Sequence, residues 1–155
     1  MRMMWRMIAV VSVLAIAQSV HAQGDPNVGT WKLNLAKSKY NAGSPPKSGT
    51  VVVAAAGQGI KVSADNMLAD GTSRKISYTV NYDGKDAPVM GTPDYDMVAM
   101  TRNGNTITGT RKKGGKQVQT FTTVVSADGK TRTTTATGTN AAGQKVDNVQ
   151  VYDKQ

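Results

Sequence analysis

The stretch VGTWKL, residues 28–33, opens the first run of β-favouring residues after a long apolar start. It places Trp31 two residues after Gly29, and the only other tryptophan is Trp5. Tryptophan is large and usually buried, with its indole N–H paired. We therefore predict structural roles for Trp31 and Gly29. Trp31 would lie in the core, and Gly29 would allow a close approach of another chain segment at the start of the strand.

The residues before this stretch have the pattern of a secretory signal peptide. Two arginines precede an apolar segment, 8–17, and residues 20–22 (Val-His-Ala) fit the small-x-Ala cleavage site. The apolar segment is shorter than the roughly 20 residues that a membrane-spanning helix needs. We expect residues 1–22 to be a Sec-type leader, cleaved after Ala22, and residues 23–155 to form a single domain. The protein would then act in the periplasm or outside a bacterial cell.

The composition of the expected mature chain restricts its chemistry. All ten acidic residues are aspartates, the single histidine, His21, lies in the leader, and there is no cysteine. Histidine is the usual general base at neutral pH, and histidine and cysteine are the usual zinc ligands. Histidine-dependent triads, cysteine nucleophiles, zinc sites and disulfides are therefore excluded. We expect a non-enzymatic protein with no cofactor and no metal.

The chain is strongly basic. Without the two leader arginines, the 19 basic residues become 17 against ten acidic ones, a net charge of +7. The densest basic cluster, expected at a hairpin tip on the surface, is Arg111, Lys112, Lys113 and Lys116. Such a cluster is usually solvated, but it would also attract an anionic polymer or lipid of the cell envelope. Nucleic acid is not expected as a partner, because no aromatic stacking pattern accompanies the charges.

The segment KISYTVNY, residues 75–82, alternates strictly between two kinds of side chain, as a half-buried β-strand does. The other β-favouring runs are 28–34, 49–56, 59–68, 96–102, 105–112, 116–126, 130–138 and 145–152. Asp-Gly, Asn-Gly and Gly-Gly pairs between them favour tight turns, and one longer gap contains DAPVMGTPDYD. We predict an all-β, antiparallel up-and-down meander of roughly eight to ten strands, closed into a barrel.

Such a barrel would have little bulky material inside it. The strand TRTTTATGT, residues 131–139, offers no large apolar side chain on either face. Either this strand buries little, or the barrel encloses a wet, threonine-lined cavity. The segment 35–49 can form at most a short helical turn, because Pro45 and Pro46 end it.

Two pairs of side chains are candidates for ligand binding. Tyr78 and Tyr82 share a face of the strand 75–82 with apolar residues, so they either line a cavity or lie in the core. Gln150 and Tyr152 share one face of the last strand. If that face points inward, both side chains could contact a ligand. Simple hydrophobic alternation would turn Val149 and Val151, on the other face, inward.

Four aspartates gather around the longer gap: Asp83, Asp86, Asp94 and Asp96. Calcium takes six to eight oxygen ligands, so a carboxylate cluster is a conceivable site. However, the spacing matches no EF-hand loop, and aspartate is an ordinary turn residue. We expect no metal there.

Both ends of the chain resemble the calycin barrels, which comprise the lipocalins and the intracellular fatty-acid-binding proteins. These proteins begin their first strand with Gly-x-Trp, as VGTWKL does here. The fatty-acid-binding members close their last strand with Arg-x-Tyr, where this chain has VQVYDKQ. The chain also resembles small exported bacterial lipocalin-like proteins, which share GTWKLN near the start, YDGKD in the middle and VY near the end.

The resemblance implies that Trp31 plugs the closed end of the barrel under a basic side chain and that Tyr152 helps to hold a ligand. Gln150 replaces the arginine partner of that tyrosine, and the second internal basic residue of the family would fall near Thr122. The paired cationic anchor for a fatty-acid head group is therefore expected to be missing. We expect a monomer that binds a small, partly apolar molecule. The alternative is a filled barrel that contacts the envelope through its basic surface.

Overall fold

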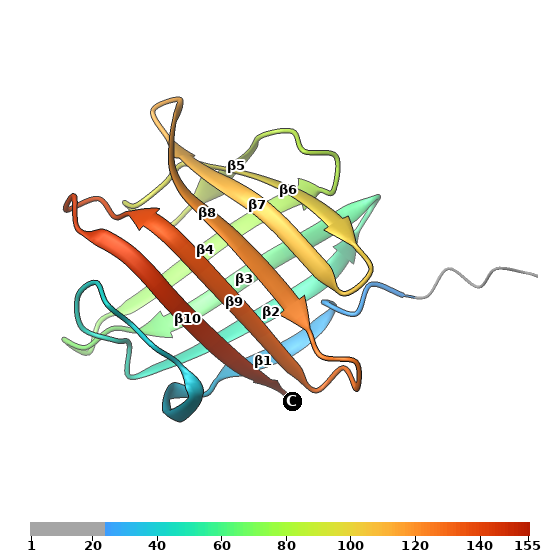
Figure 1. Cartoon of the computed structure of the whole chain (residues 1–155), viewed down its shortest axis with the longest axis horizontal. Helices are drawn as coiled ribbons and strands as arrows, with labels where there is room; N and C mark the ends of the chain where they lie inside the picture. Colours follow the sequence, from blue (N-terminus) through green and yellow to red (C-terminus); the bar gives the residue numbers. More distant parts are fainter. Residues whose placement is uncertain (1–23) are drawn as a thin grey trace, which may run out of the picture.

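The structure is a computed structural model, and it describes residues 24–155. The expected leader, residues 1–22, lies outside the described residues. The described chain forms ten strands and one short 3-10 helix (Figure 1): β1 (Gly29–Leu33), η1 (Leu35–Lys37), β2 (Ser48–Ala56), β3 (Gly59–Met67), β4 (Ser73–Asn81), β5 (Ala87–Met90), β6 (Met97–Asn103), β7 (Thr106–Lys113), β8 (Lys116–Val125), β9 (Thr131–Thr139) and β10 (Lys145–Lys154). Within residues 24–155, no helix has the length and apolar character needed to span a membrane.

Each strand pairs antiparallel with its neighbours in sequence, and β1 also pairs with β10. In that closing pair, Trp31 lies opposite Lys154 and Leu33 lies opposite Tyr152. The described strands therefore form one closed barrel, which protects strand edges from pairing with other chains. The predicted antiparallel meander that closes into a barrel is confirmed.

The longer gap around residues 86–96 contains a strand that the sequence pattern did not predict. In β5, which is four residues long, Val89 pairs with Tyr78 of β4. Gly91 follows the strand with a φ of +88°, and a Cβ there would lie 1.7 Å from the carbonyl oxygen of Lys75. A proline inside the strand and a glycine directly after it are typical of turns, which is why the strand was missed.

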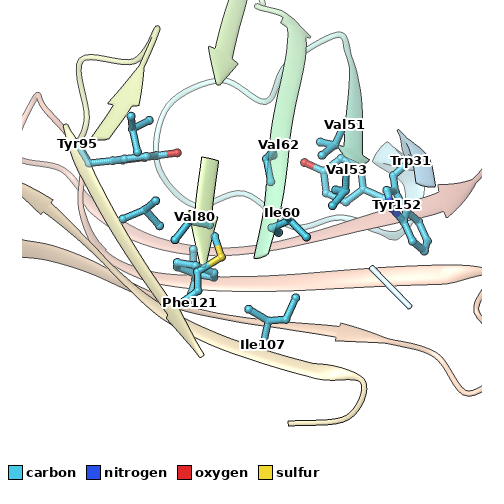
Figure 2. Packing of buried hydrophobic residues seen from close by; sticks show 14 of the residues in the cluster. Trp31, Val51, Val53, Ile60, Val62, Val80, Tyr95, Ile107, Phe121 and Tyr152 are labelled. Atoms are coloured by element: carbon cyan, nitrogen blue, oxygen red, sulfur yellow. The ribbon is translucent and has the colours of Figure 1, made fainter. Parts of the chain in front are cut away.

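Inward-facing side chains of most strands pack into one apolar core (Figure 2). Figure 2 shows Trp31 at one end of this cluster and Tyr95 at the other. On β2, Val51 and Val53 are buried, whereas Val52 between them is 43% exposed. This alternation is the period of two that a strand imposes, and it decides which side chains reach the interior.

Trp31 is fully buried, with 0% of its surface exposed. Its indole N–H donates to the carbonyl oxygen of Asn27 at 2.9 Å, and the Lys154 ammonium lies 5.2 Å from the ring centroid. Gly29 has a φ of +146°, and a Cβ there would lie 2.8 Å from Cε of Lys154. The glycine therefore permits the basic side chain to lie across the indole, and Trp31 has the buried position that the sequence predicts.

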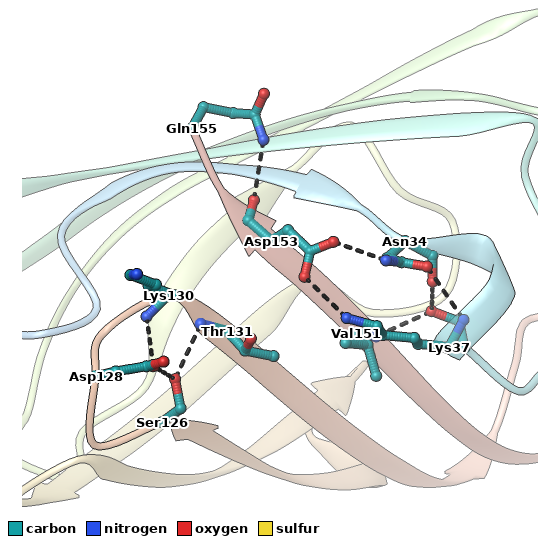
Figure 3. A network of polar contacts seen from close by, with 10 residues as sticks. Asn34, Lys37, Ser126, Asp128, Lys130, Thr131, Val151, Asp153 and Gln155 are labelled. Atoms are coloured by element: carbon teal, nitrogen blue, oxygen red, sulfur yellow. Dashed lines mark hydrogen bonds and ion pairs between the residues drawn. The ribbon is translucent and has the colours of Figure 1, made fainter.

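Residues 34–39, which include the short helical turn η1, run alongside β10, and Lys39 forms an antiparallel bridge with Val149. The Asn34 side-chain amide donates to the Asp153 carboxylate at 2.7 Å (Figure 3). Val151, whose carbonyl oxygen accepts the backbone N–H of Asn34, is only 9% exposed. Gln150 and Tyr152 line the interior cavity, whereas Val149 and Val151 do not, so the polar face of the strand points inward. This resolves the conflict between hydrophobic alternation and the calycin resemblance in favour of the resemblance.

Candidate ligand-binding site

A cavity of about 480 Å³ lies inside the barrel. Loop residues also line it: Tyr40, Ala42, Ser44, Pro46, residues 92–95 and residues 140–142. Apolar side chains of β2, β3 and β4 form part of its wall. The wall also includes Thr123 and Thr134, whose buried hydroxyls lie 2.8 Å apart. This volume is typical of small-molecule sites. Of the two readings of the threonine-rich strand, the structure favours the partly polar cavity.

Arg111 reaches the cavity from β7, just before a register shift in that strand. Its guanidinium carbon lies 4.7 Å from the ring centroids of both Tyr95 and Phe121, and its Nη1 donates to Gln119 at 2.8 Å. Gly109 precedes it on the same strand face, where a Cβ would lie 2.4 Å from Cζ of Phe121. The glycine leaves room for the ring on which the guanidinium stacks.

Arg132 reaches the cavity from β9 and is only 9% exposed. Its Nε donates to the side-chain oxygen of Asn27 at 2.8 Å, and its guanidinium carbon lies 5.5 Å from the Tyr152 ring centroid. Burial lowers the pKa of the Arg132 guanidinium, and the positive charge of Arg111 acts in the same direction. An arginine pKa starts so high that the group stays charged at neutral pH.

Neither interior guanidinium has a carboxylate partner within residues 24–155, a range that contains all ten acidic residues of the chain. Asp94, which also lines the cavity, accepts the backbone N–H of Ala141 at 2.9 Å and lies 3.8 Å from Arg74. A buried charge is costly unless it is paired. The described side chains therefore leave two positive charges in the cavity without neutralisation.

These arginines correct the expectation that a paired cationic anchor is missing. Gln150 does replace the arginine of the family motif, but Arg111 and Arg132 enter from β7 and β9 instead. Motif positions could not reveal them, since neither arginine lies where the resemblance placed a basic residue. One signal was available for Arg111. Ile107 is buried, and Arg111 lies four residues later on the same face of the strand, so alternation with a period of two predicts that Arg111 points inward.

Three of the four predicted ligand-binding residues line the cavity: Tyr78, Gln150 and Tyr152. The Gln150 amide nitrogen donates to the Tyr40 hydroxyl at 3.2 Å. The hydroxyls of Tyr78 and Tyr152 form no hydrogen bond within the described part of the chain, and neither is sealed off from the cavity. They are positioned to donate to a molecule inside, and their role as ligand contacts stays a prediction.

Tyr82 lies elsewhere, which corrects the expectation that both tyrosines of β4 and its end would line the cavity. Its hydroxyl donates to the Asp25 carboxylate at 2.5 Å, and the Arg102 guanidinium lies 5.4 Å from its ring centroid. Burial, together with the hydrogen bond to Asp25, raises the pKa of Tyr82 well above its usual value. Tyr82 thus fastens the segment before β1 to the barrel.

The basic cluster expected at the β7–β8 hairpin is divided, and the prediction of a surface position is wrong for Arg111. Arg111 faces the cavity, and the Lys112 ammonium pairs with the Asp86 carboxylate at 2.7 Å. Lys113 and Lys116 are exposed at the surface. Two solvated lysines at a turn make a weak surface for an anionic polymer.

The four aspartates around β5 do not gather into one group. Three of them accept backbone N–H groups, from Lys85, Gly114 and Ala141. Asp86 pairs with Lys112, and Asp94 also lies near Arg74. Across residues 24–155, no three acidic or histidine side chains come together as a metal-binding group. Their observed role is to fix turns and to hold cations at the barrel rim.

The two cavity tyrosines give the folded state a predictable pH dependence. Burial raises the pKa of Tyr78 to about 12 and that of Tyr152 to about 12. The positive charges of Arg111 and Arg132 lower both pKa values and so oppose part of this rise. In the unfolded chain the pKa of tyrosine is about 10, so that state loses these protons first. We expect the free energy of unfolding to be constant below about pH 9 and to fall as the pH rises from about 10 to 12.

Urea titrations at a series of alkaline pH values measure this loss, and phenolate absorbance follows the tyrosines directly. Replacing Tyr152 with phenylalanine should make the alkaline decline shallower, because one titrating group is removed. Ionisation of all tyrosines of the folded protein near pH 10 would contradict the expected burial.

A closed antiparallel barrel around a small-molecule cavity, with Trp31 buried at the end of the first strand pair, defines a calycin-like β-barrel. Its fold is similar to that of the zebrafish ileal bile acid-binding protein, whose crystal structure was determined with cholic acid. The TM-score is 0.51 and the sequence identity is 13%, and the match covers 84% of this chain and 99% of that chain. No protein-family model matches the sequence, and no curated protein matches it. The resemblance to the calycin barrels is thus confirmed for the fold.

Proposed function

We propose that this chain is an exported, non-enzymatic binding protein that holds a small, partly apolar molecule with an anionic group inside its barrel. The observation that carries this proposal is the pair of unneutralised guanidinium groups, Arg111 and Arg132, in a cavity of about 480 Å³. An anion would supply charge-assisted hydrogen bonds to both groups. The apolar wall from β2, β3 and β4 would accept the rest of the molecule.

Three further observations support this proposal. The zebrafish protein of similar fold was crystallised with cholic acid, which favours a small, partly apolar partner. The leader pattern of residues 1–22 supports a place of action in the periplasm or outside the cell. The expected mature chain has no histidine, cysteine or glutamate, which favours binding over catalysis.

The proposal predicts a difference between two molecules with the same apolar chain. Decanoate carries one negative charge at neutral pH, whereas decanol carries none. We expect the purified protein to bind decanoate about tenfold to hundredfold more tightly than decanol, because only the anion forms charge-assisted hydrogen bonds with the arginines. Displacement of an environment-sensitive apolar dye measures both affinities. The proposal fails if neither compound displaces the dye, or if decanol displaces it as well as decanoate does.

A further inference from the structure

We infer that the group held between Arg111 and Arg132 is a phosphate monoester, so that the ligand is a phosphorylated amphiphile. This inference rests on the proposed function and adds the chemistry and charge of the head group. Its basis is the charge, the hydrogen-bonding capacity and the arrangement of the groups that meet in the cavity.

The charge of the site calls for a dianion. Two guanidinium groups face one cavity, and within residues 24–155 no carboxylate lies within 4.0 Å of either. A single carboxylate or sulfate ester would neutralise only half of this charge. A phosphate monoester carries a charge between about −1.5 and −2 at pH 7, which matches two guanidinium groups.

The free donors of the site outnumber what a carboxylate can accept. Arg111 uses one N–H group on Gln119, and Arg132 uses one on Asn27; neither forms another hydrogen bond inside the described chain. Each guanidinium has five N–H donors in a planar fork that binds two oxygens side by side. One carboxylate offers two oxygens and suits one fork. The three terminal oxygens of a phosphate monoester can be shared between two forks.

Both arginines line one continuous cavity, which the cavity tyrosines share. Tyr152 lies beside Arg132, with its ring centroid 5.5 Å from the guanidinium carbon, and Tyr78 lines the same cavity. Burial raises the pKa of each of these tyrosines, and the positive charges of both arginines oppose that rise. Each phenol is therefore within the electrostatic reach of both guanidinium groups. The two hydroxyls, which are free of partners in the described chain, add two neutral donors to the same head group.

Two decyl esters test this inference, because they share a chain and a tetrahedral head group but differ in charge. Decyl sulfate is a monoanion at every pH used, whereas decyl phosphate gains its second charge above about pH 6. With the purified protein, below micelle-forming concentrations, calorimetry at about pH 8 should show decyl phosphate binding about tenfold to hundredfold more tightly than decyl sulfate. Near pH 5 this preference should disappear, because both head groups then carry one charge.

Replacing one arginine tests whether that arginine interacts with the second negative charge of the phosphate. The Arg111→Gln variant should bind the two esters with affinities that differ by no more than about threefold at pH 8. The matched control is Lys113→Gln, which removes the same charge from an exposed site on the same strand and should keep the preference. If Arg111→Gln does not fold, the pH dependence of the unaltered protein still decides the question.

The outcomes separate this inference from the proposed function. Equal binding of the two esters at pH 8, with both bound more tightly than decanol, overturns the dianion and leaves the anion-binding function intact. Preference for decyl sulfate also overturns it. Failure of every anion to bind more tightly than decanol removes both proposals together.

Discussion

Replacing Trp31 with alanine is expected to lower the free energy of unfolding by about 3–5 kcal/mol, the usual cost of removing a large buried side chain. The indole has 0% of its surface exposed, so the change leaves a hole that the barrel can fill only by collapsing around it. It also leaves the Asn27 carbonyl oxygen without its 2.9 Å partner and Lys154 without the ring beneath it. Lost packing and lost hydrogen bonding therefore act in the same direction.

Urea unfolding followed by far-ultraviolet circular dichroism measures this loss without depending on tryptophan fluorescence. A suitable control is Val52→Ala on the neighbouring strand, because Val52 is 43% exposed and pairs with Thr30. That variant should stay within about 0.5 kcal/mol of the unaltered protein. A loss below about 1.5 kcal/mol for Trp31→Ala would show that the closed end does not depend on the indole.

Replacing both Arg111 and Arg132 with glutamine is expected to weaken the binding of an anionic amphiphile about 10²- to 10⁴-fold. Each arginine would form at least one hydrogen bond with a charged group, worth about 1.5–3 kcal/mol, and 1.4 kcal/mol corresponds to a factor of ten in affinity. The affinity for decanol should change little, because the apolar wall from β2, β3 and β4 is untouched. The double variant would thus lose the distinction between decanoate and decanol.

A matched control removes two positive charges from the outside of the same barrel. Lys113→Gln combined with Lys116→Gln changes the net charge by the same amount at exposed positions of the β7–β8 hairpin. This control should keep the affinity for decanoate at moderate ionic strength, because exposed charges are screened by salt. If the two double variants lose affinity equally, general attraction by the basic protein explains the binding, and a specific interior anchor does not.

Much of the barrel was predictable from local sequence, because hairpin turns and period-two alternation are local signals. KISYTVNY, which corresponds to most of β4, shows the alternation clearly, and the glycine pairs mark most of the hairpins. β5 escaped because its four residues include a proline and are followed by Gly91. Its strand geometry depends on pairing with β4 and β6, which a sequence pattern does not contain.

The binding site was less predictable, because an inward face must be inferred from apolar neighbours. Arg111 belongs to the run Arg-Lys-Lys, which reads as a solvated tip, although counting in twos from buried Ile107 turns it inward. Arg132 lies on a strand whose inner face carries only small neighbours, Thr134 and Ala136. Only the register with the adjacent strands places it inside. Tyr78 was found because it alternates with apolar residues on its strand, although the same alternation wrongly placed Tyr82 in the cavity. Tyr152 was found through the calycin resemblance, against simple hydrophobic alternation.

Asn27 links the closed end of the barrel to its interior charge. Its carbonyl oxygen accepts the indole N–H of Trp31, and its side-chain oxygen accepts the Nε–H of Arg132, while only 1% of its surface is exposed. A molecule that draws Arg132 toward its head group must therefore pull on the residue that fixes the indole. Trp31 is the only tryptophan in residues 24–155, so a change in its emission is the expected signal of a molecule bound at Arg132.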